Sequence, residues 1–216
     1  DDVNGLLEQH GRESMGFYAR LREKRKDDSD LQACVEKVLG ELESAADPDK
    51  PGMLLGKIQS GKTRAFLGVI ARAFDFDYEI AIVLTKGTKT LATQTVKRIG
   101  RDFKEFIDSD EVILFDIMQT PESLTKAELR RKIVIVAKKQ VHNLSRVRAL
   151  FENEKYSSLR TRRILLIDDE ADMASIRFTK KANDPDFDQG TIANQMDDLR
   201  RSFRISFLQV TATPYA

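Results

Sequence analysis

Between residues 51 and 216, short apolar runs alternate with segments whose apolar residues recur at helical spacing. Runs that are apolar throughout are typical of parallel strands that are covered on both faces. Strand, helix, strand repetition with right-handed crossovers therefore predicts an α/β fold with a doubly wound, mainly parallel sheet. The predicted strands are residues 53–55, 80–84, 112–115, 133–137, 164–167 and 206–210.

The same pattern predicts two parts of the chain. Residues 1–50 carry no strand signal, and an apolar stripe behind a predicted Ser29 N-cap indicates an N-terminal helical segment. Turn-forming residues then mark the entry to an α/β lobe over residues 51–216. Helices are predicted over residues 63–74, 91–107 and 141–151, and an irregular loop over residues 179–190.

Composition limits the possible partners and compartments. The chain has 216 residues, with 36 Lys and Arg against 35 Asp and Glu, so its net charge of +1 gives no global attraction to a phosphate polymer. A single cysteine, Cys34, excludes a disulfide framework and indicates a reducing compartment. No apolar run is long enough to cross a bilayer, and the acidic start is unlike a signal peptide. We therefore expect a soluble, cytoplasmic protein without a membrane partner.

A phosphate-binding loop is the most specific motif. Gly56 to Thr63 read G-K-I-Q-S-G-K-T, between a predicted strand and a predicted helix. Glycines let successive N–H groups point into one concavity, and the helix start adds a positive dipole. The motif predicts a nucleoside triphosphate, with Lys62 on the β- and γ-phosphates and the Thr63 hydroxyl on Mg²⁺. The residues expected to bind it are Gly56, Gln59, Ser60, Gly61, Lys62, Thr63 and Arg64.

An acidic strand end supplies the second half of the predicted site. The strand at residues 164–167 is followed by Asp168, Asp169 and Glu170. Because Mg²⁺ keeps several waters and takes few protein oxygens, one aspartate suffices for the metal. We assign the metal to Asp169 and the attacking water to Glu170, with Asp168 as the alternative metal ligand. We expect Lys62 and Asp169 to lie at the tips of neighbouring strands.

Several motifs resemble those of superfamily-two helicases. Residues 169–172 read D-E-A-D, and Thr211 to Thr213 resemble the S/T-A-T motif, while residues 89–94 resemble the R-E-L-A-x-Q element. The phosphate loop, the strand at 133–136 with the following K-K-Q, and T-A-T-P-Y-A are similar to bacterial helicase-like ATPases of restriction and phage-defence systems. The resemblance covers about residues 51–216 and leaves residues 1–50 without an interpretation.

The resemblance implies the first RecA-like lobe of an ATP hydrolase that acts on DNA or RNA, with DNA favoured. ATP and Mg²⁺ are the implied cofactors, and Thr211 and Thr213 are implied to couple hydrolysis to movement. A second RecA-like lobe would supply arginine fingers, so we expect it on a continuation beyond Ala216 and expect this chain alone to be poorly active. The implied nucleic-acid contacts are Lys86, Thr88, Lys89, Thr90, Lys138 and Lys139.

Other readings of the chain are weaker or compete with this one. A nucleotide-gated scaffold for protein partners is the alternative function, whereas a GTPase is disfavoured because no N/T-K-x-D motif is present. No metal-nuclease triad of the D…E-x-K type is evident. His10 and His142 have no acid or cysteine at metal-ligand spacing. The basic residues Arg160, Arg162 and Arg163 precede a strand and are interpreted as structural.

Overall fold

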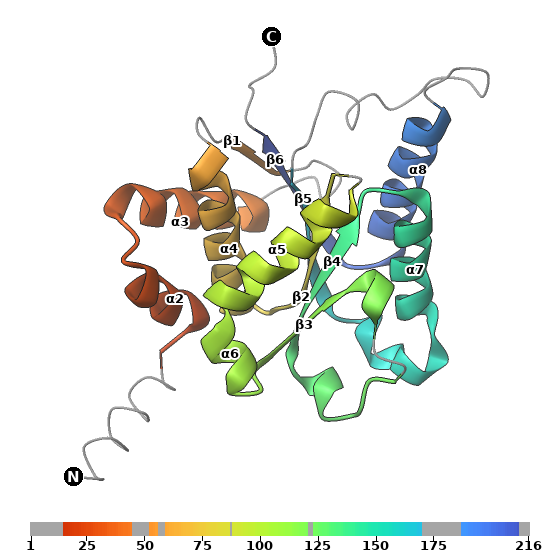
Figure 1. Ribbon diagram of the computed structural model, residues 1–216, viewed down its shortest axis with the longest axis horizontal. Coiled ribbons are helices and arrows are strands. Elements are labelled where there is room, and N and C mark those ends of the chain that lie inside the picture. Colours follow the sequence, from red (N-terminus) through yellow and green to blue (C-terminus); the bar gives the residue numbers. More distant parts are fainter. Residues whose placement is uncertain are drawn as a thin grey trace.

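The computed structural model describes residues 15–44, 52–55, 59–86, 88–120, 123–169 and 187–211. These residues form a six-stranded sheet in which every neighbouring pair is parallel, in the order β1-β6-β5-β2-β4-β3 (Figure 1). The strands are β1 Gly52–Leu55, β2 Tyr78–Thr85, β3 Val112–Asp116, β4 Lys132–Lys138, β5 Arg163–Asp169 and β6 Ile205–Thr211. The predicted parallel α/β fold is confirmed, and each predicted strand is present with slightly wider bounds.

Helices cover both faces of this sheet. The described helices are α2 Phe17–Arg25, α3 Ser29–Ser44, α4 Gln59–Phe74, α5 Lys89–Asp102, α6 Lys104–Asp108, α7 Val141–Glu152 and α8 Phe187–Ser202, with short 3₁₀ turns at Ile117–Gln119, Glu128–Arg130 and Glu154–Leu159. In Figure 1, α7 and α8 lie on one side of the sheet and α2 to α6 on the other. No helix among the described residues is long and apolar enough to span a membrane.

Three local predictions were wrong. The N-cap of α3 is Asp28 rather than Ser29, because the Asp28 carboxylate accepts the Leu31 N–H at 2.8 Å. The helix predicted over residues 91–107 is interrupted at Phe103, whose buried ring packs edge-on against Phe106 at 5.4 Å between centroids. Finally, α8 begins at Phe187, inside the predicted irregular loop, of which residues 179–186 lie outside the described residues.

Alternation along the strands divides the interior into two cores. In β5, Leu165 and Ile167 pack with α4, whereas Ile164 and Leu166 pack with α7 and α8. The same alternation holds in β2, where Ala81 and Val83 face α4 and their neighbours face the other way. Successive side chains of a strand point to opposite faces, so the position of a residue in this series tells which helical layer it faces.

The helix α4 is enclosed on almost every side. It lies between the sheet and the pair α2 and α3, which we call the N-terminal layer (residues 17–44) (Figure 1). A helix that is apolar all round is typical of such an interior position. Its buried residues are Ala65, Phe66, Leu67, Val69, Ile70, Ala71, Ala73 and Phe74. The N-terminal layer thus shares one hydrophobic core with the sheet.

Candidate functional site

The phosphate-loop motif continues directly into α4, at the carboxyl end of β1. β1 ends at Leu55 and α4 begins at Gln59, so Gln59 to Thr63 form the first turns of the helix. Lys62 is only 9% exposed, and a Cβ added at Gly61 would meet no other atom within 4 Å. The helix start therefore leaves room beside Gly61, where N–H groups point toward any anion bound at the strand end. Gly56 lies outside the described residues, as do the side chains of Gln59 and Ser60.

The phosphate-loop strand and the acidic strand are not neighbours, so the prediction of adjacent tips was wrong. β6 lies between β1 and β5 and pairs with both of them. Sequence order could not reveal this, because the order of parallel strands is set by how the crossovers pack. With about 4.8 Å between neighbouring strands, the tips of β1 and β5 lie roughly 10 Å apart on the same edge of the sheet.

The two aspartates at the end of β5 face opposite sides of the sheet. Asp169 continues the series Leu165 and Ile167, which packs with α4, whereas Asp168 continues the series of Ile164 and Leu166. Asp168 is completely buried and Asp169 is partly exposed. Asp169 thus shares the face of α4 and Lys62, which favours it over Asp168 as the metal ligand.

A buried ion pair engages Asp168. The Lys139 ammonium lies 2.8 Å from Asp168 Oδ1, with side-chain exposures of 11% and 0%. Lys139 directly follows β4, and β2 lies between β4 and β5, so its side chain crosses the tip of β2. The Lys139 N–H also donates to the Thr85 carbonyl at 2.8 Å, at the end of β2. Lys139 therefore binds a carboxylate at this edge, a role that the sequence analysis did not foresee.

A buried asparagine fixes the turn that carries Lys139. Asn143, only 1% exposed, accepts the Lys138 N–H through Oδ1 at 3.1 Å. A buried side-chain amide is expensive unless it is hydrogen-bonded, so this contact holds the start of α7 against the end of β4. An Asn five residues after Lys138 was the sequence signal for this contact, but that spacing is too common to predict it.

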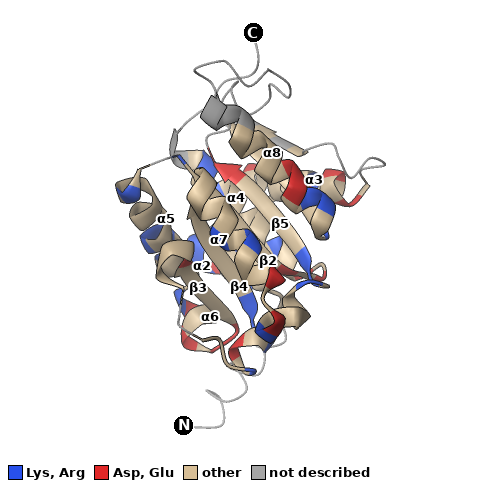
Figure 2. Cartoon of the chain, turned by 90° about the vertical axis from the view of Figure 1, so that its right-hand side faces the viewer, with Lys and Arg blue, Asp and Glu red and all other residues tan. Residues whose placement is uncertain are grey.

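The remaining polymer-contact candidates surround the start of α5. Lys86, Thr88, Lys89 and Thr90 are exposed, and the Thr88 hydroxyl caps α5 by accepting the Leu91 N–H at 3.3 Å. From Lys86 to Arg101 the sequence contains no acidic residue. Blue segments along α5 in Figure 2 mark its Lys and Arg residues. The exposed basic residues on and just before α5 are Lys86, Lys89, Lys97, Arg98 and Arg101.

Other predicted site residues are placed as follows. Arg64 donates to the Asp27 carboxylate at 2.9 Å, so its guanidinium is engaged by the N-terminal layer, and its contact with a nucleotide stays a prediction. Thr211 is the last residue of β6 and is 5% exposed. Glu170 and Thr213 lie outside the described residues.

The arginines at and just before the start of β5 have structural partners, as predicted. Arg163 pairs with Glu43 of α3 at 2.7 Å, Arg162 donates to the Arg131 carbonyl at 3.3 Å, and Arg160 donates to the Phe151 carbonyl at 3.0 Å. These contacts lie at the amino end of β5, away from the carboxyl edge. His142 is exposed, and within the described ranges no three His, Cys, Asp or Glu side chains converge as a metal site would require.

The carboxyl edge of the sheet therefore has two sides. The start of α4 with the nearly buried Lys62 lies on one face together with the partly exposed Asp169. The buried Lys139–Asp168 pair belongs to the other face. Figure 2 shows the acidic tip of β5 at this edge. No protein-family model matches the chain, and a search of curated proteins found no match. The helicase resemblance thus rests on the motifs alone.

Proposed function

We propose that this chain is the Mg-ATP-binding, RecA-like lobe of a helicase-like ATPase that acts on nucleic acid. One observation carries the proposal: the phosphate-loop helix α4 and Asp169 of β5 lie on the same face of the sheet, at its carboxyl edge. Ligands of open α/β sheets bind in the crevice at that edge. A phosphate loop without an acidic strand on its face would have supported only a generic anion site.

The residues at this edge fit a magnesium triphosphate. Lys62 is only 9% exposed, so little water surrounds its side chain. Because screening by water is weaker there, its attraction to the β- and γ-phosphates is stronger than at an exposed site. Thr63 and Asp169 offer a hydroxyl and a carboxylate, the hard oxygen donors that Mg²⁺ prefers. The metal, when bound, neutralises charge on the phosphates. Glu170 is proposed to orient the water, and a second lobe to supply the arginine that stabilises transferred charge.

The buried Lys139–Asp168 pair supports different roles for Asp168 and Asp169. A fully buried carboxylate with an ammonium at 2.8 Å is less accessible to a hydrated divalent ion than the partly exposed Asp169. We therefore assign Asp168 to holding the ends of β4 and β5 together, and Asp169 to the metal. Lys138 stays a proposed polymer contact, whereas Lys139 serves the ion pair.

The basic residues on and just before α5 support nucleic acid as the partner. Lys86, Lys89, Lys97 and Arg98 are exposed, and none of them forms an ion pair within the described part of the chain. The stretch from Lys86 to Arg101 carries exposed basic residues and no acidic one, so in a protein of net charge +1 it is a local electrostatic footprint for phosphates. The start of this stretch coincides with the loop that resembles a helicase element.

Binding of a nonhydrolysable Mg-ATP analogue, measured by calorimetry on this chain, tests the proposal. Lys62→Ala should abolish detectable binding, because the variant removes the cation that meets the β- and γ-phosphates. Lys37→Ala is the matched control, since Lys37 is a lysine of α3 whose side chain is 78% exposed. Equal affinity in Lys62→Ala and the parent chain would remove the site assignment and the function with it.

A further inference from the structure

A tight corner between α2 and α3 buries an aspartate next to the phosphate-loop helix. Lys26 ends α2 in the left-handed conformation (φ 53°), and its N–H closes the helix onto the Arg22 and Glu23 carbonyls. The next residue, Asp27, turns inward, and its side chain is 0% exposed. Burying a carboxylate is costly unless charged partners surround it, so its partners reveal what the corner does.

Two arginines from different helices hold the Asp27 carboxylate. Arg64 of α4 donates to Oδ1 from Nη2 at 2.9 Å and from Nε at 3.2 Å, while Arg25 donates to the same carboxylate from Nε at 3.1 Å and from Nη2. The arginines also bind each other's backbone: Arg25 Nη1 donates to the Arg64 carbonyl at 3.1 Å, and Arg64 Nη2 donates to the Arg25 carbonyl. Each link is charge-assisted, the stronger class of hydrogen bond.

Neighbouring groups show how enclosed this network is. Tyr18 packs at the same corner, and burial together with the Asp27 charge raises the pKa of Tyr18 to about 12. Gly68 of α4 approaches the N-terminal layer so closely that an added Cβ would lie 2.7 Å from Val35 and 3.4 Å from Arg25 Nη2. Helix α4 is therefore held against the corner by both packing and charge, which leaves it little freedom to rotate.

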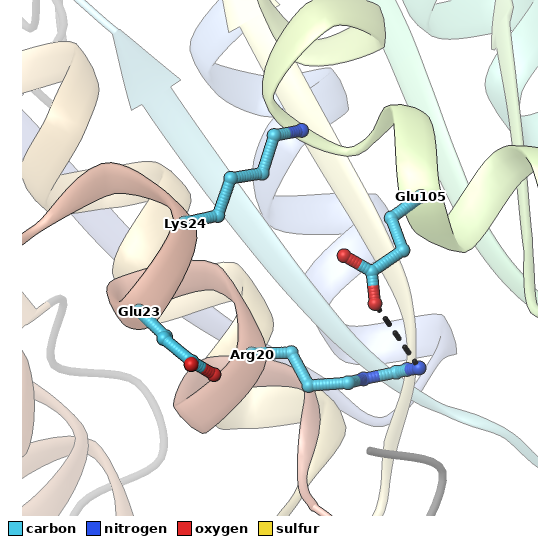
Figure 3. A pocket seen from close by; sticks show the side chains of 4 residues that line it. All are labelled: Arg20, Glu23, Lys24 and Glu105. Carbon is cyan, nitrogen blue, oxygen red and sulfur yellow. Dashed lines mark ion pairs between the residues drawn. The ribbon is translucent and has the colours of Figure 1, made fainter. Parts of the chain in front are cut away.

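The network continues from α2 to the end of the basic helix α5. The Lys24 ammonium donates to the Arg101 and Asp102 carbonyls at 3.1 and 3.0 Å, and Arg25 lies 3.8 Å from the Asp102 carboxylate. Figure 3 shows the pocket between α2 and α6, which is lined by Arg20, Glu23, Lys24 and Glu105. Arg20 of α2 reaches across it to Glu105 of α6 at 3.7 Å, whereas the Lys24 side chain points away from Arg20. The pocket carries two cations and two carboxylates, so it is a seam between helices rather than an anion site.

We propose that Asp27 is a positioning residue for the phosphate loop, and that the N-terminal layer thereby sets the affinity for the nucleotide. Arg64 follows Thr63 directly, so fixing both its side chain and its carbonyl fixes the rotation of the first turns of α4. That rotation directs the Lys62 side chain and the N–H groups at the helix start. The inference rests on the proposed function and gives a role to residues 17–44, which the helicase resemblance leaves without one.

The test is the affinity of Asp27→Asn for a nonhydrolysable Mg-ATP analogue, measured by calorimetry well below the melting temperature. The amide keeps the size of the carboxylate but loses its charge, so we expect roughly tenfold weaker binding, the equivalent of about one weakened hydrogen bond to a charged group. Glu36→Gln is the matched control. It removes the Arg72–Glu36 ion pair, which joins α3 to α4 at 2.8 Å. This pair also links the N-terminal layer to α4, but eight residues further along α4 from Arg64, about 12 Å away. The control should bind like the parent chain.

A second variant separates positioning from direct contact. Arg64→Gln removes the same link from a partly exposed side chain (44%), so it should fold even if Asp27→Asn does not. If Arg64 acts through Asp27, the two single variants and the double variant should lose affinity equally, because all three break one link. Additive losses would instead show that Arg64 contacts the nucleotide, and would overturn the positioning role.

The two proposals fail in different ways. If Lys62→Ala binds the analogue like the parent, the nucleotide site itself is wrong. If Lys62→Ala abolishes binding while Asp27→Asn and Arg64→Gln both bind like the parent, only the positioning role of the N-terminal layer is wrong. Equal weakening by Glu36→Gln would also overturn it, because any loosening of the α3–α4 contact would then suffice.

Discussion

The buried Lys139–Asp168 pair should contribute measurably to stability. Lys139→Met keeps most of the side-chain volume but leaves a fully buried carboxylate without its ammonium. Removing one partner of a buried pair costs about 3–5 kcal/mol. Because Lys139 is 11% exposed and water can reach its end of the pair, we expect a loss near the lower limit, about 3 kcal/mol. For a chain of this length that loss corresponds to a melting temperature lower by roughly 6–12 °C.

Urea unfolding followed by circular dichroism measures this loss through a double-mutant cycle. Asp168→Asn alone should cost a similar amount, whereas the double variant should cost far less than the sum of the two single changes. Lys104→Met is the control, because it breaks the exposed Lys104–Asp108 pair of α6, whose side chains are 69% and 61% exposed, and should change stability by less than about 0.5 kcal/mol. If Lys139→Met matched this control, or if the two single losses simply added, the reasoning about the buried pair would be refuted.

Two further predictions concern the N-terminal layer and the basic helix. Gly68→Ala gains about 1 kcal/mol of helix propensity, but it brings a Cβ within 2.7 Å of Val35. We therefore expect the free energy of unfolding, measured in urea, to fall by about 1 kcal/mol, and the loss to disappear in a Val35→Ala background. A Gly68→Ala variant that is more stable than the parent would contradict the packing. Lys89→Gln should lower the slope of log affinity against log salt for DNA by about one unit, while the exposed Lys155→Gln should leave it unchanged; an unaltered slope in Lys89→Gln would remove that contact.

The sequence predicted the sheet well because its signal is local. Each strand is a continuous apolar run, and burial on both faces of a parallel sheet requires such runs, as β5 shows between Ile164 and Ile167. Helix α8 was not predicted, and its first residues were assigned to the irregular loop, because Asp188 and Gly190 are poor helix formers, although Met196 and Leu199 supply an apolar face that packs on the sheet.

The candidate site was predictable only in part, since some of its contacts are set by tertiary structure. The phosphate loop is a contiguous motif and could be found directly. The choice between Asp168 and Asp169 needed the strand register, because a shift of one residue exchanges the two faces. Two contacts of the site join residues far apart in the sequence: Lys139 and Asp168 are 29 positions apart, and Asp27 and Arg64 are 37 positions apart. A local sequence pattern cannot predict such pairs.

The enclosure of α4 bears on how much of this chain is needed for folding. A polypeptide shortened to start at residue 51 would retain every motif, yet it would bare the flank of α4 on which Tyr18, Val35 and Leu39 rest. An apolar flank of that kind in water favours association over folding. We therefore expect a stable folding unit to include α2 and α3 in addition to the motif-bearing segment.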